Sequence, residues 1–238
     1  MIKLVMFDLD GTLLPFDQKE FVKAYFGGLA KKLAVHGYDP EKVISAIWAG
    51  AAAMAKNDGT RKNEEVWWES FVNIFGKRAL ADIPVFEEYY AKDFDSVKSI
   101  CGYEPMAKEI IDMLHARGVR TVLATNPMFP SIATEKRMSW AGLTPKDFEI
   151  FTTYENYSSC KPNLAYYKEI LAKTDCLPEE CVMVGNDVRE DVVASTAFGM
   201  HSFLLLNDYL LNKDNADITA FPRGNFDDLL AHVKGLMA

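Results

Sequence analysis

The stretch MFDLDGTLLPFD at residues 6–17 ends the first apolar run of the chain and places two acids directly before a glycine. The run Ile2–Phe7 has the length and composition of a buried β-strand. A turn after this strand explains Gly11. It does not explain Asp8 and Asp10, whose two-residue spacing points both side chains to one side of an extended backbone. The two carboxylates are therefore either ordinary turn residues or a pair held close by a positive charge.

Short apolar runs later in the chain also have the character of buried strands, and helical patterns separate them. Together with the first run, the predicted strands cover residues 2–7, 119–125, 149–152, 181–185 and 201–206. The helices predicted between and after them cover residues 105–117, 164–173, 190–198 and 226–237. This alternation is typical of an α/β fold with a doubly wound, parallel, Rossmann-like sheet.

Residues 16–97 do not follow this alternation of strands and helices, because no segment among them resembles a strand. Asp17 with Glu20 predicts the capped start of a helix, and Asp39 with Pro40 predicts a second start. Two more helices are expected before residue 97. The chain is therefore predicted to form a core domain of residues 1–15 and 98–238 with an all-helical domain of residues 16–97 inserted. The aromatic residues of the insert are expected in its own core, with one or two facing a cleft: Trp48, Trp67, Trp68 and Phe71.

The overall charge of the chain limits its partners. The 238 residues carry a formal net charge of −8, which argues against a general surface for nucleic acid or for anionic membranes. A small phosphorylated substrate remains compatible with this charge, because one cation in a site can bind a phosphate even when the net charge of the chain is negative. The four cysteines show no CxxC spacing, and no apolar run suggests a signal peptide or a membrane span. We expect a cytoplasmic protein with reduced thiols, a monomer by default and with its oligomeric state open.

Ligands of parallel α/β sheets bind at the carboxyl ends of the strands. At or just after these ends the sequence places acids, a hydroxyl beside an amide, a lysine and again acids. In chain order they are Asp8 and Asp10, Thr125 and Asn126, Lys161, and Asp187 and Asp191. The last two are four residues apart, so the start of a helix would align them on one face. Together these residues predict one polar site.

Several carboxylates so close together need a compensating cation. Mg²⁺ accepts one or two carboxylates, a carbonyl and waters, and it leaves positions for phosphate oxygens. Lys161 adds a second positive charge, and Thr125 and the backbone amide after it add donors that suit a tetrahedral dianion. In such a site Asp8 would attack phosphorus and form an aspartyl-phosphate. Asp10 would protonate the leaving oxygen and then activate water.

The segments DLDGT at residues 8–12 and GNDVRED at residues 185–191, with Thr125 and Lys161-Pro162 between them, resemble the four motifs of the haloacid-dehalogenase-like (HAD) superfamily. The resemblance covers residues 1–15 and 98–238, and the helical insert resembles the C1-type cap of that superfamily. It implies Asp8 as nucleophile and Asp10 as acid and base. It implies Mg²⁺ held by Asp8, the Asp10 carbonyl and Asp187, with Asp191 as a further ligand or beside the ligands, and phosphate held by Thr125, the Asn126 backbone and Lys161.

Asp10 also distinguishes branches of this superfamily. Members that dehalogenate or cleave phosphonates generally lack an acid two places after the nucleophile, and the related transport ATPases carry a threonine there. The resemblance therefore implies a Mg²⁺-dependent phosphatase that hydrolyses a small phosphorylated metabolite. A phosphomutase acting on a sugar phosphate shares every core residue and stays open. So does a phosphorylated, receiver-like signalling module, although receivers are about half this length and have no helical insert.

Some residues near the motifs are expected to have ordinary structural roles. Asp17 is expected to cap a helix, and Cys160 to be a small filler beside Lys161. Arg61 and Lys62 are expected on a solvated face of the insert. The four histidines match no motif.

Overall fold

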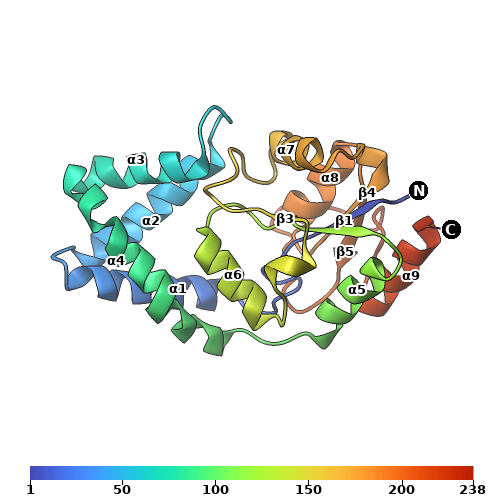
Figure 1. The fold of residues 1–238 in the computed structure, drawn as a ribbon, viewed down its shortest axis with the longest axis horizontal. Coiled ribbons are helices and arrows are strands. Elements are labelled where there is room, and N and C mark those ends of the chain that lie inside the picture. The colour runs from blue at the N-terminus through green and yellow to red at the C-terminus, as the bar shows by residue number, and fades with distance from the viewer. Residues whose placement is uncertain (238) are drawn as a thin grey trace.

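The computed structural model describes residues 1–237, whose core is a six-stranded parallel sheet (Figure 1). The strand order is β3-β2-β1-β4-β5-β6, and every neighbouring pair is parallel. The strands are β1 (Leu4–Phe7), β2 (Arg120–Leu123), β3 (Ile150–Phe151), β4 (Cys181–Gly185), β5 (His201–Leu205) and β6 (Arg223–Gly224). The predicted α/β class with a doubly wound parallel sheet is confirmed.

Helices cover both faces of the sheet, because successive side chains of each buried strand point to opposite sides. Val5 and Phe7 of β1 pack with α5 (Pro105–His115) and α9 (Phe226–Met237) on one face. Leu4 and Met6 pack with α7 (Leu164–Thr174) and α8 (Ala194–Ala197) on the other. In Figure 1 the two pairs of helices lie on opposite sides of the strands. The other elements of this part are α6 (Ser131–Trp140), η4 (Pro145–Asp147), η5 (Pro178–Glu180) and η6 (Val188–Val193).

All the elements between β1 and α5 are helices, and we call this part of the chain the helical insert. Its elements are α1 (Gln18–Ala34), α2 (Pro40–Ala55), α3 (Asn63–Phe75), η1 (Lys77–Asp82), α4 (Ile83–Glu88), η2 (Tyr89–Asp93) and η3 (Phe94–Ile100). Asp17 caps α1 by accepting from two backbone N–H groups, and Asp39 caps α2. In Figure 1 the insert lies at one end of the molecule, beyond the strand ends that are farthest from the two chain termini.

The aromatic side chains of the insert form most of its interior. Trp67 stacks on Phe71 with ring centroids 5.0 Å apart, and Phe86 meets both rings edge-on. Trp48 differs, because it is 54% exposed. Trp48 also lines a cavity between the insert and the sheet, so both predicted roles for the aromatic residues occur in the insert.

The insert also contacts the rest of the chain away from its two connecting segments. The backbone N–H of Asn63 donates to the Tyr157 carbonyl at 2.9 Å, and its buried side chain donates to the Pro127 carbonyl at 3.1 Å. Within residues 1–237, no helix combines the length and the apolar character needed to cross a bilayer.

Besides some short helical turns, one α-helix and one strand were absent from the sequence prediction. Helix α6 presents Thr134 and Arg137 to the interior, so its apolar periodicity is weak and does not predict a helix. Strand β6 has two residues, too few for any pattern. The predicted helix over 190–198 occurs as η6 followed by α8.

Candidate active site

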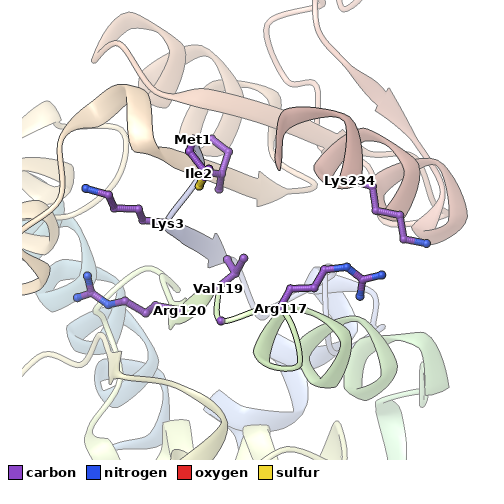
Figure 2. A pocket seen from close by; sticks show the side chains of 8 residues that line it. Met1, Ile2, Lys3, Arg117, Val119, Arg120 and Lys234 are labelled. Atoms are coloured by element: carbon purple, nitrogen blue, oxygen red, sulfur yellow. The ribbon is translucent and has the colours of Figure 1, made fainter. Parts of the chain in front are cut away.

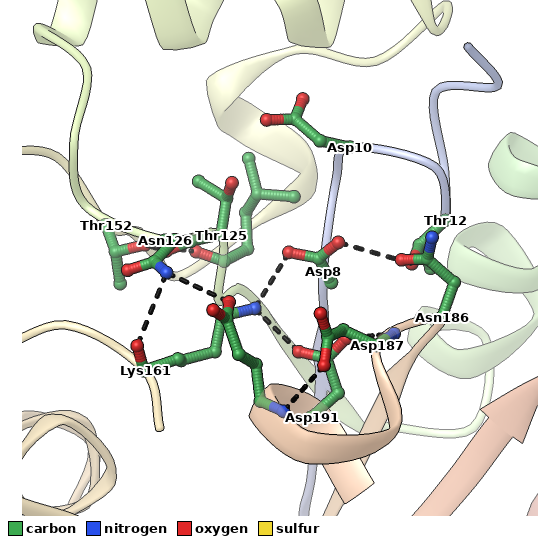
Figure 3. A network of polar contacts seen from close by, with 12 residues as sticks. Asp8, Asp10, Thr12, Thr125, Asn126, Thr152, Lys161, Asn186, Asp187 and Asp191 are labelled. Carbon is green, nitrogen blue, oxygen red and sulfur yellow. Dashed lines mark hydrogen bonds and ion pairs between the residues drawn. The ribbon is translucent and has the colours of Figure 1, made fainter. Parts of the chain in front are cut away.

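The carboxyl ends of β1, β2 and β4 meet at one edge of the sheet, where a cavity of about 420 Å³ opens toward the insert. All seven side chains predicted for the site line this cavity: Asp8, Asp10, Thr125, Asn126, Lys161, Asp187 and Asp191. Figure 3 shows all of them around the end of β1. The parallel topology brings them together because β1 lies between β2 and β4.

Lys161 joins two of the acids in the buried part of the site. Its Nζ donates to Asp8 Oδ1 at 2.8 Å and to Asp191 Oδ1 at 2.6 Å, as the dashed lines in Figure 3 show. Burial alone would lower the pKa of Lys161, but the carboxylates of Asp191 and Asp8 raise it well above its ordinary value. Lys161 is therefore a fixed positive charge at the end of β1.

Asp191 and Asp187 lie at the start of η6. Asp191 is fully buried, and its Oδ2 accepts the backbone N–H of Asp187 at 3.0 Å. Burial raises the pKa of Asp191, and Lys161 opposes that shift. Asp187 Oδ1 accepts the N–H groups of Arg189 and Glu190, each at 2.9 Å, and this holds its carboxylate at the rim of the cavity.

The turn after β1 lies close to Asn186, which follows β4, and this close approach depends on Gly11. Its φ is +82°, and a Cβ there would lie 2.4 Å from Asn186 Nδ2. This approach allows Thr12 Oγ1 to sit 3.0 Å from Asn186 Oδ1 and 3.3 Å from Asp8 Oδ2. The turn after β1 and the turn after β4 therefore contact each other next to the carboxylate of Asp8.

Thr125 and Asn126 end the segment that follows β2. The carbonyl of Thr125 accepts from the Tyr166 hydroxyl at 2.9 Å and from the Thr152 hydroxyl, which fixes the backbone at this point. Asn126 Nδ2 donates to Glu190 Oε2 at 2.9 Å. Because this amide is engaged, the Asn126 backbone is the better candidate for contact with an anion. Burial raises the pKa of Glu190.

Asp10 stands apart from the Lys161 group, as Figure 3 shows. Its side chain is 27% exposed, and its Oδ2 accepts from the guanidinium of Arg137, which is fully buried. Asp10 Oδ1 is buried and has no hydrogen-bond partner within residues 1–237. Burial raises the pKa of Asp10, and Arg137 opposes that shift.

The helical insert contributes one wall of the cavity. The wall consists of small or uncharged side chains from α1 and α2, namely Gln18, Trp48, Ala51, Ala52 and Ala55. Lys213, from the segment after β5, is the one cation besides Lys161 among the lining residues. Arg61 and Lys62 do not line this cavity, and Arg61 pairs with Glu69.

Cys160 is buried beside Lys161 and accepts from Asn63 Nδ2 at 3.4 Å. Burial raises the pKa of its thiol to about 12, so Cys160 is an unreactive thiol. All four cysteines are free.

Several site residues were not identified from the sequence. They are Thr12, Arg137, Asn186, Glu190, Lys213 and the wall formed by the insert. Thr12, Asn186 and Glu190 lie inside quoted motifs, so their position was a usable signal. Arg137 and Lys213 had no such signal, because they are far from any motif in sequence.

A second cavity, of about 660 Å³, lies at the opposite ends of β1 and β2 (Figure 2). Four basic side chains line it: Lys3, Arg117, Arg120 and Lys234. Lys3 pairs with Glu180 at 2.5 Å, and Arg120 pairs with Glu149 at 2.5 Å, so acids already neutralise two of the four. Within residues 1–237, no carboxylate lines this cavity, and the site residues predicted from the sequence are at the other end of the strands.

The residues around Asp8 suit a hard cation of small size. Residues 1–237 contain no cluster of three or more His, Cys, Asp or Glu side chains arranged to hold a metal. The predicted magnesium site differs from such a cluster, since it uses two carboxylates, from Asp8 and Asp187, one backbone carbonyl, from Asp10, and waters. Asp187 Oδ2 receives no hydrogen bond from any described residue, so this oxygen is available. The donor set therefore fits Mg²⁺.

Known proteins resemble this chain over most of its length. A family model described as haloacid dehalogenase-like hydrolase matches residues 2–199. Ribulose-1,5-bisphosphate 5-phosphatase of Halopiger xanaduensis is 26% identical over 217 residues, which cover 86% of this chain and 84% of that protein. Phosphoglycolate phosphatase of Aquifex aeolicus is 22% identical over 229 residues, which cover 96% of this chain and 95% of that one.

A solved structure shows the same fold. The HAD phosphatase from Thermococcus onnurineus superposes with a TM-score of 0.62 at 18% identity, covering 98% of this chain and 99% of that chain. The match of the family model extends over most of the chain, from just before β1 to just after α8. The chain belongs to the haloacid dehalogenase-like hydrolase family.

Proposed function

We propose that this phosphoric monoester hydrolase is a Mg²⁺-dependent phosphatase that acts on a small phosphorylated metabolite through an aspartyl-phosphate on Asp8. The observation that carries the proposal is the contact of Lys161 Nζ with Asp8 Oδ1 and Asp191 Oδ1, at 2.8 and 2.6 Å, beside the acids of β1 and β4. A cation fixed against a nucleophilic carboxylate suits the transfer of a dianionic phosphoryl group. The phosphatase relatives support the same reaction class.

The site residues divide into groups that hold the phosphate and groups that hold the metal. Thr125, the Asn126 backbone and Lys161 contact the phosphoryl oxygens. Asp8, the carbonyl of Asp10 and Asp187 hold Mg²⁺, and Asp191 lies beside them, where it fixes Lys161 and the Asp187 backbone. When bound, Mg²⁺ offsets the negative charge of the carboxylates and of the phosphoryl oxygens.

The reaction proceeds in two steps on Asp8. In the first, a carboxylate oxygen of Asp8 forms a bond to phosphorus, the bond to the leaving oxygen breaks, and Asp10 gives its proton to that oxygen. In the second, Asp10 takes a proton from water, the water oxygen bonds to phosphorus, and the bond to Asp8 breaks. The products are inorganic phosphate and free Asp8, so the cycle closes.

We propose that residues 16–97 act as a cap over the site. The insert supplies Gln18, Trp48 and the alanines of α2 to the cavity, so it faces the leaving group. A wall of this kind excludes bulk water from the site during the first step. It also protects the acyl phosphate until Asp10 activates one water molecule for the second step. The residues that contact the leaving group are therefore expected in the cap.

The proposal is tested by phosphate release from a panel of phosphorylated metabolites and from 4-nitrophenyl phosphate, with added Mg²⁺ and after chelation. We expect release that depends on Mg²⁺ and returns when the ion is restored. Asp187→Asn is expected to raise the Mg²⁺ concentration needed for half-maximal rate by roughly 10- to 100-fold or more, since loss of even the partners of a ligand has that effect.

Asp214→Asn makes the same chemical change at an exposed residue and should leave the metal requirement unchanged. Equal rates with and without divalent metal would contradict the magnesium site. Isomerisation of a sugar phosphate without net phosphate release would instead identify a phosphomutase.

The insert wall makes a prediction about substrate size. Ala55→Phe places a ring into the 420 Å³ cavity, so kcat/KM for 1-naphthyl phosphate should fall by roughly 10- to 100-fold, as expected from the cost of overpacking. Acetyl phosphate is small enough to be little affected. Ala53→Phe is the matched control, because Ala53 is on the same helix but lines a different cavity. Equal losses for both substrates would show that this wall does not face the leaving group.

A further inference from the structure

Arg137 is a fully buried arginine that contacts the site from outside it. It lies on α6, its side chain is 0% exposed, and its Nη1 donates to Asp10 Oδ2. Arg137 is not among the residues that line the catalytic cavity, whereas Asp10 is. Arg137 contacts two residues that do line it, Asp10 and Phe129, and of these only Asp10 carries a group that can exchange a proton.

The guanidinium of Arg137 is held by an aromatic ring and by hydrogen bonds from all three of its nitrogens. It lies over the ring of Phe129, with 4.1 Å between its central carbon and the ring centroid. Its Nη2 donates to Thr134 Oγ1 at 3.2 Å, and its Nε donates to the Ala133 carbonyl at 3.4 Å. A planar group fixed in this way presents one N–H in a defined direction, and that N–H meets Asp10.

The pair leaves one oxygen of Asp10 unused. Asp10 Oδ2 is occupied by Arg137, while Oδ1 is buried and has no partner within residues 1–237. An ion pair with a purely structural role would be expected to satisfy both carboxylate oxygens, because an unpaired buried acceptor is costly. A carboxyl group that transfers a proton suits the arrangement seen here, in which one oxygen is anchored and the other has no partner.

We propose that Arg137 is a positioning residue of the reaction, which anchors Asp10 Oδ2 so that Asp10 Oδ1 exchanges the proton with the leaving oxygen and with water. This inference rests on the proposed role of Asp10. In the acid form, Oδ2 accepts from Arg137 while Oδ1 carries the proton, so the anchor is compatible with both steps. Without it the carboxyl group is free to rotate, and a misplacement of about 1 Å can lower a rate by roughly 10²-fold.

The anchor also connects Asp10 to the insert. The Phe129 ring under the guanidinium packs against Tyr25 of α1, with 5.1 Å between the ring centroids, and against Phe21 at 6.3 Å. The orientation of Arg137 therefore depends on the position of α1. Phe129→Leu removes the stacking surface, keeps an apolar side chain and leaves every hydrogen-bonding partner of Arg137 in place.

The test compares leaving groups of similar shape in Arg137 variants. 4-Nitrophenyl phosphate has a leaving group that departs readily without a proton, whereas phenyl phosphate gains more from protonation. For Arg137→Gln we expect kcat/KM for phenyl phosphate to fall by roughly 10²-fold, the lower end of what general acid catalysis contributes, and kcat/KM for 4-nitrophenyl phosphate to fall by less than about 5-fold. Arg137→Lys should be intermediate, because it keeps the charge but loses the planar fork.

Two comparisons separate this inference from a general defect and from failure of the proposed function. Lys136 is on the same helix as Arg137 and forms an ion pair with Asp95. Lys136→Met breaks this pair, and any decrease in kcat/KM should be equal for the two substrates. Asp10→Asn should likewise lower kcat/KM much more for phenyl phosphate than for 4-nitrophenyl phosphate. Adding Arg137→Gln to Asp10→Asn should have no further effect on kcat/KM. If Arg137→Gln does not fold, judged by its thermal unfolding, then Arg137→Lys and Phe129→Leu carry the same comparison.

Equal losses for both substrates in the Arg137 variants, while Asp10→Asn keeps the leaving-group pattern, would overturn the role of Arg137 alone. If wild-type protein releases no phosphate, or Asp10→Asn shows no dependence on the leaving group, the proposed function itself fails.

Discussion

Asp8→Asn is expected to lower kcat for phosphate release by roughly 10⁴-fold or more, because it removes the nucleophile and an amide cannot form the acyl phosphate. The fold should remain intact. Asn has the shape of Asp, and the buried Lys161 keeps its ion pair with Asp191 at 2.6 Å. The thermal unfolding midpoint should therefore equal or exceed that of the wild-type protein, since one of several close acids is gone.

The measurement is phosphate release in both proteins, together with mass spectrometry of acid-quenched wild-type enzyme. We expect the phosphoryl adduct on the peptide that contains Asp8 and on no other. Asp17→Asn is the matched control, because Asp17 caps α1 from an exposed position and Asn is an equally good cap. Activity of Asp8→Asn equal to that of wild type would exclude covalent catalysis at this residue.

Lys161→Met is expected to have the second largest effect, on both activity and stability. It removes the fixed cation that contacts the phosphoryl group, which should lower kcat by roughly 10²- to 10³-fold. It also leaves the carboxylates of Asp8 and Asp191 buried without their partner. Breaking a buried pair from one side lowers the free energy of unfolding by roughly 3–5 kcal/mol.

The stability loss of Lys161→Met should depend on pH in a defined direction. Burial raises the pKa of Asp191, and Lys161 opposes this shift in the wild-type protein. Without Lys161, the folded state binds the Asp191 proton more tightly than the unfolded state does. Stability then rises as pH falls, so the deficit of the variant should be smaller in mild acid than at neutral pH.

Denaturant unfolding at both pH values measures this effect. Lys173→Met is the matched control, because Lys173 pairs with Glu169 at 3.2 Å near the surface, where such pairs contribute about 1 kcal/mol or less. The double variant Lys161→Met with Asp191→Asn should recover part of the stability but none of the activity. A Lys161→Met protein as stable as Lys173→Met would show that the buried charges are compensated by other means.

The sequence predicted much of the sheet and the residues that meet in the cavity because both depend on local patterns. Buried parallel strands appear as apolar runs, and four of the five predicted runs are longer than the observed strands by a few residues at their ends. A parallel sheet then places all carboxyl ends at one edge, so residues as distant in sequence as Asp8 and Lys161 are predicted to meet. Their contact at 2.8 Å agrees with that prediction.

The residues that were missed depend on contacts without a local signal. Helix α6 carries an arginine on its buried face, so its pattern resembles a solvated segment, although Arg137 is fully buried. Only the packing of Phe129 and the position of Asp10 show why a charge is tolerated there. Lys213 and the alanines of α2 likewise belong to the cavity because of how the insert and the segment after β5 are placed.

The sequence by itself determined the fold class, the family resemblance and the set of acids, hydroxyl, amide and lysine at the strand ends. These follow from hydrophobic periodicity and from motif order, which do not require coordinates. The tertiary structure decided which oxygen of each acid is occupied, that Asp10 is paired with Arg137 and not with Lys161, and that Trp48 faces the cavity while Trp67 is buried. Such differences arise from side-chain packing between distant segments, and no short stretch of sequence contains them.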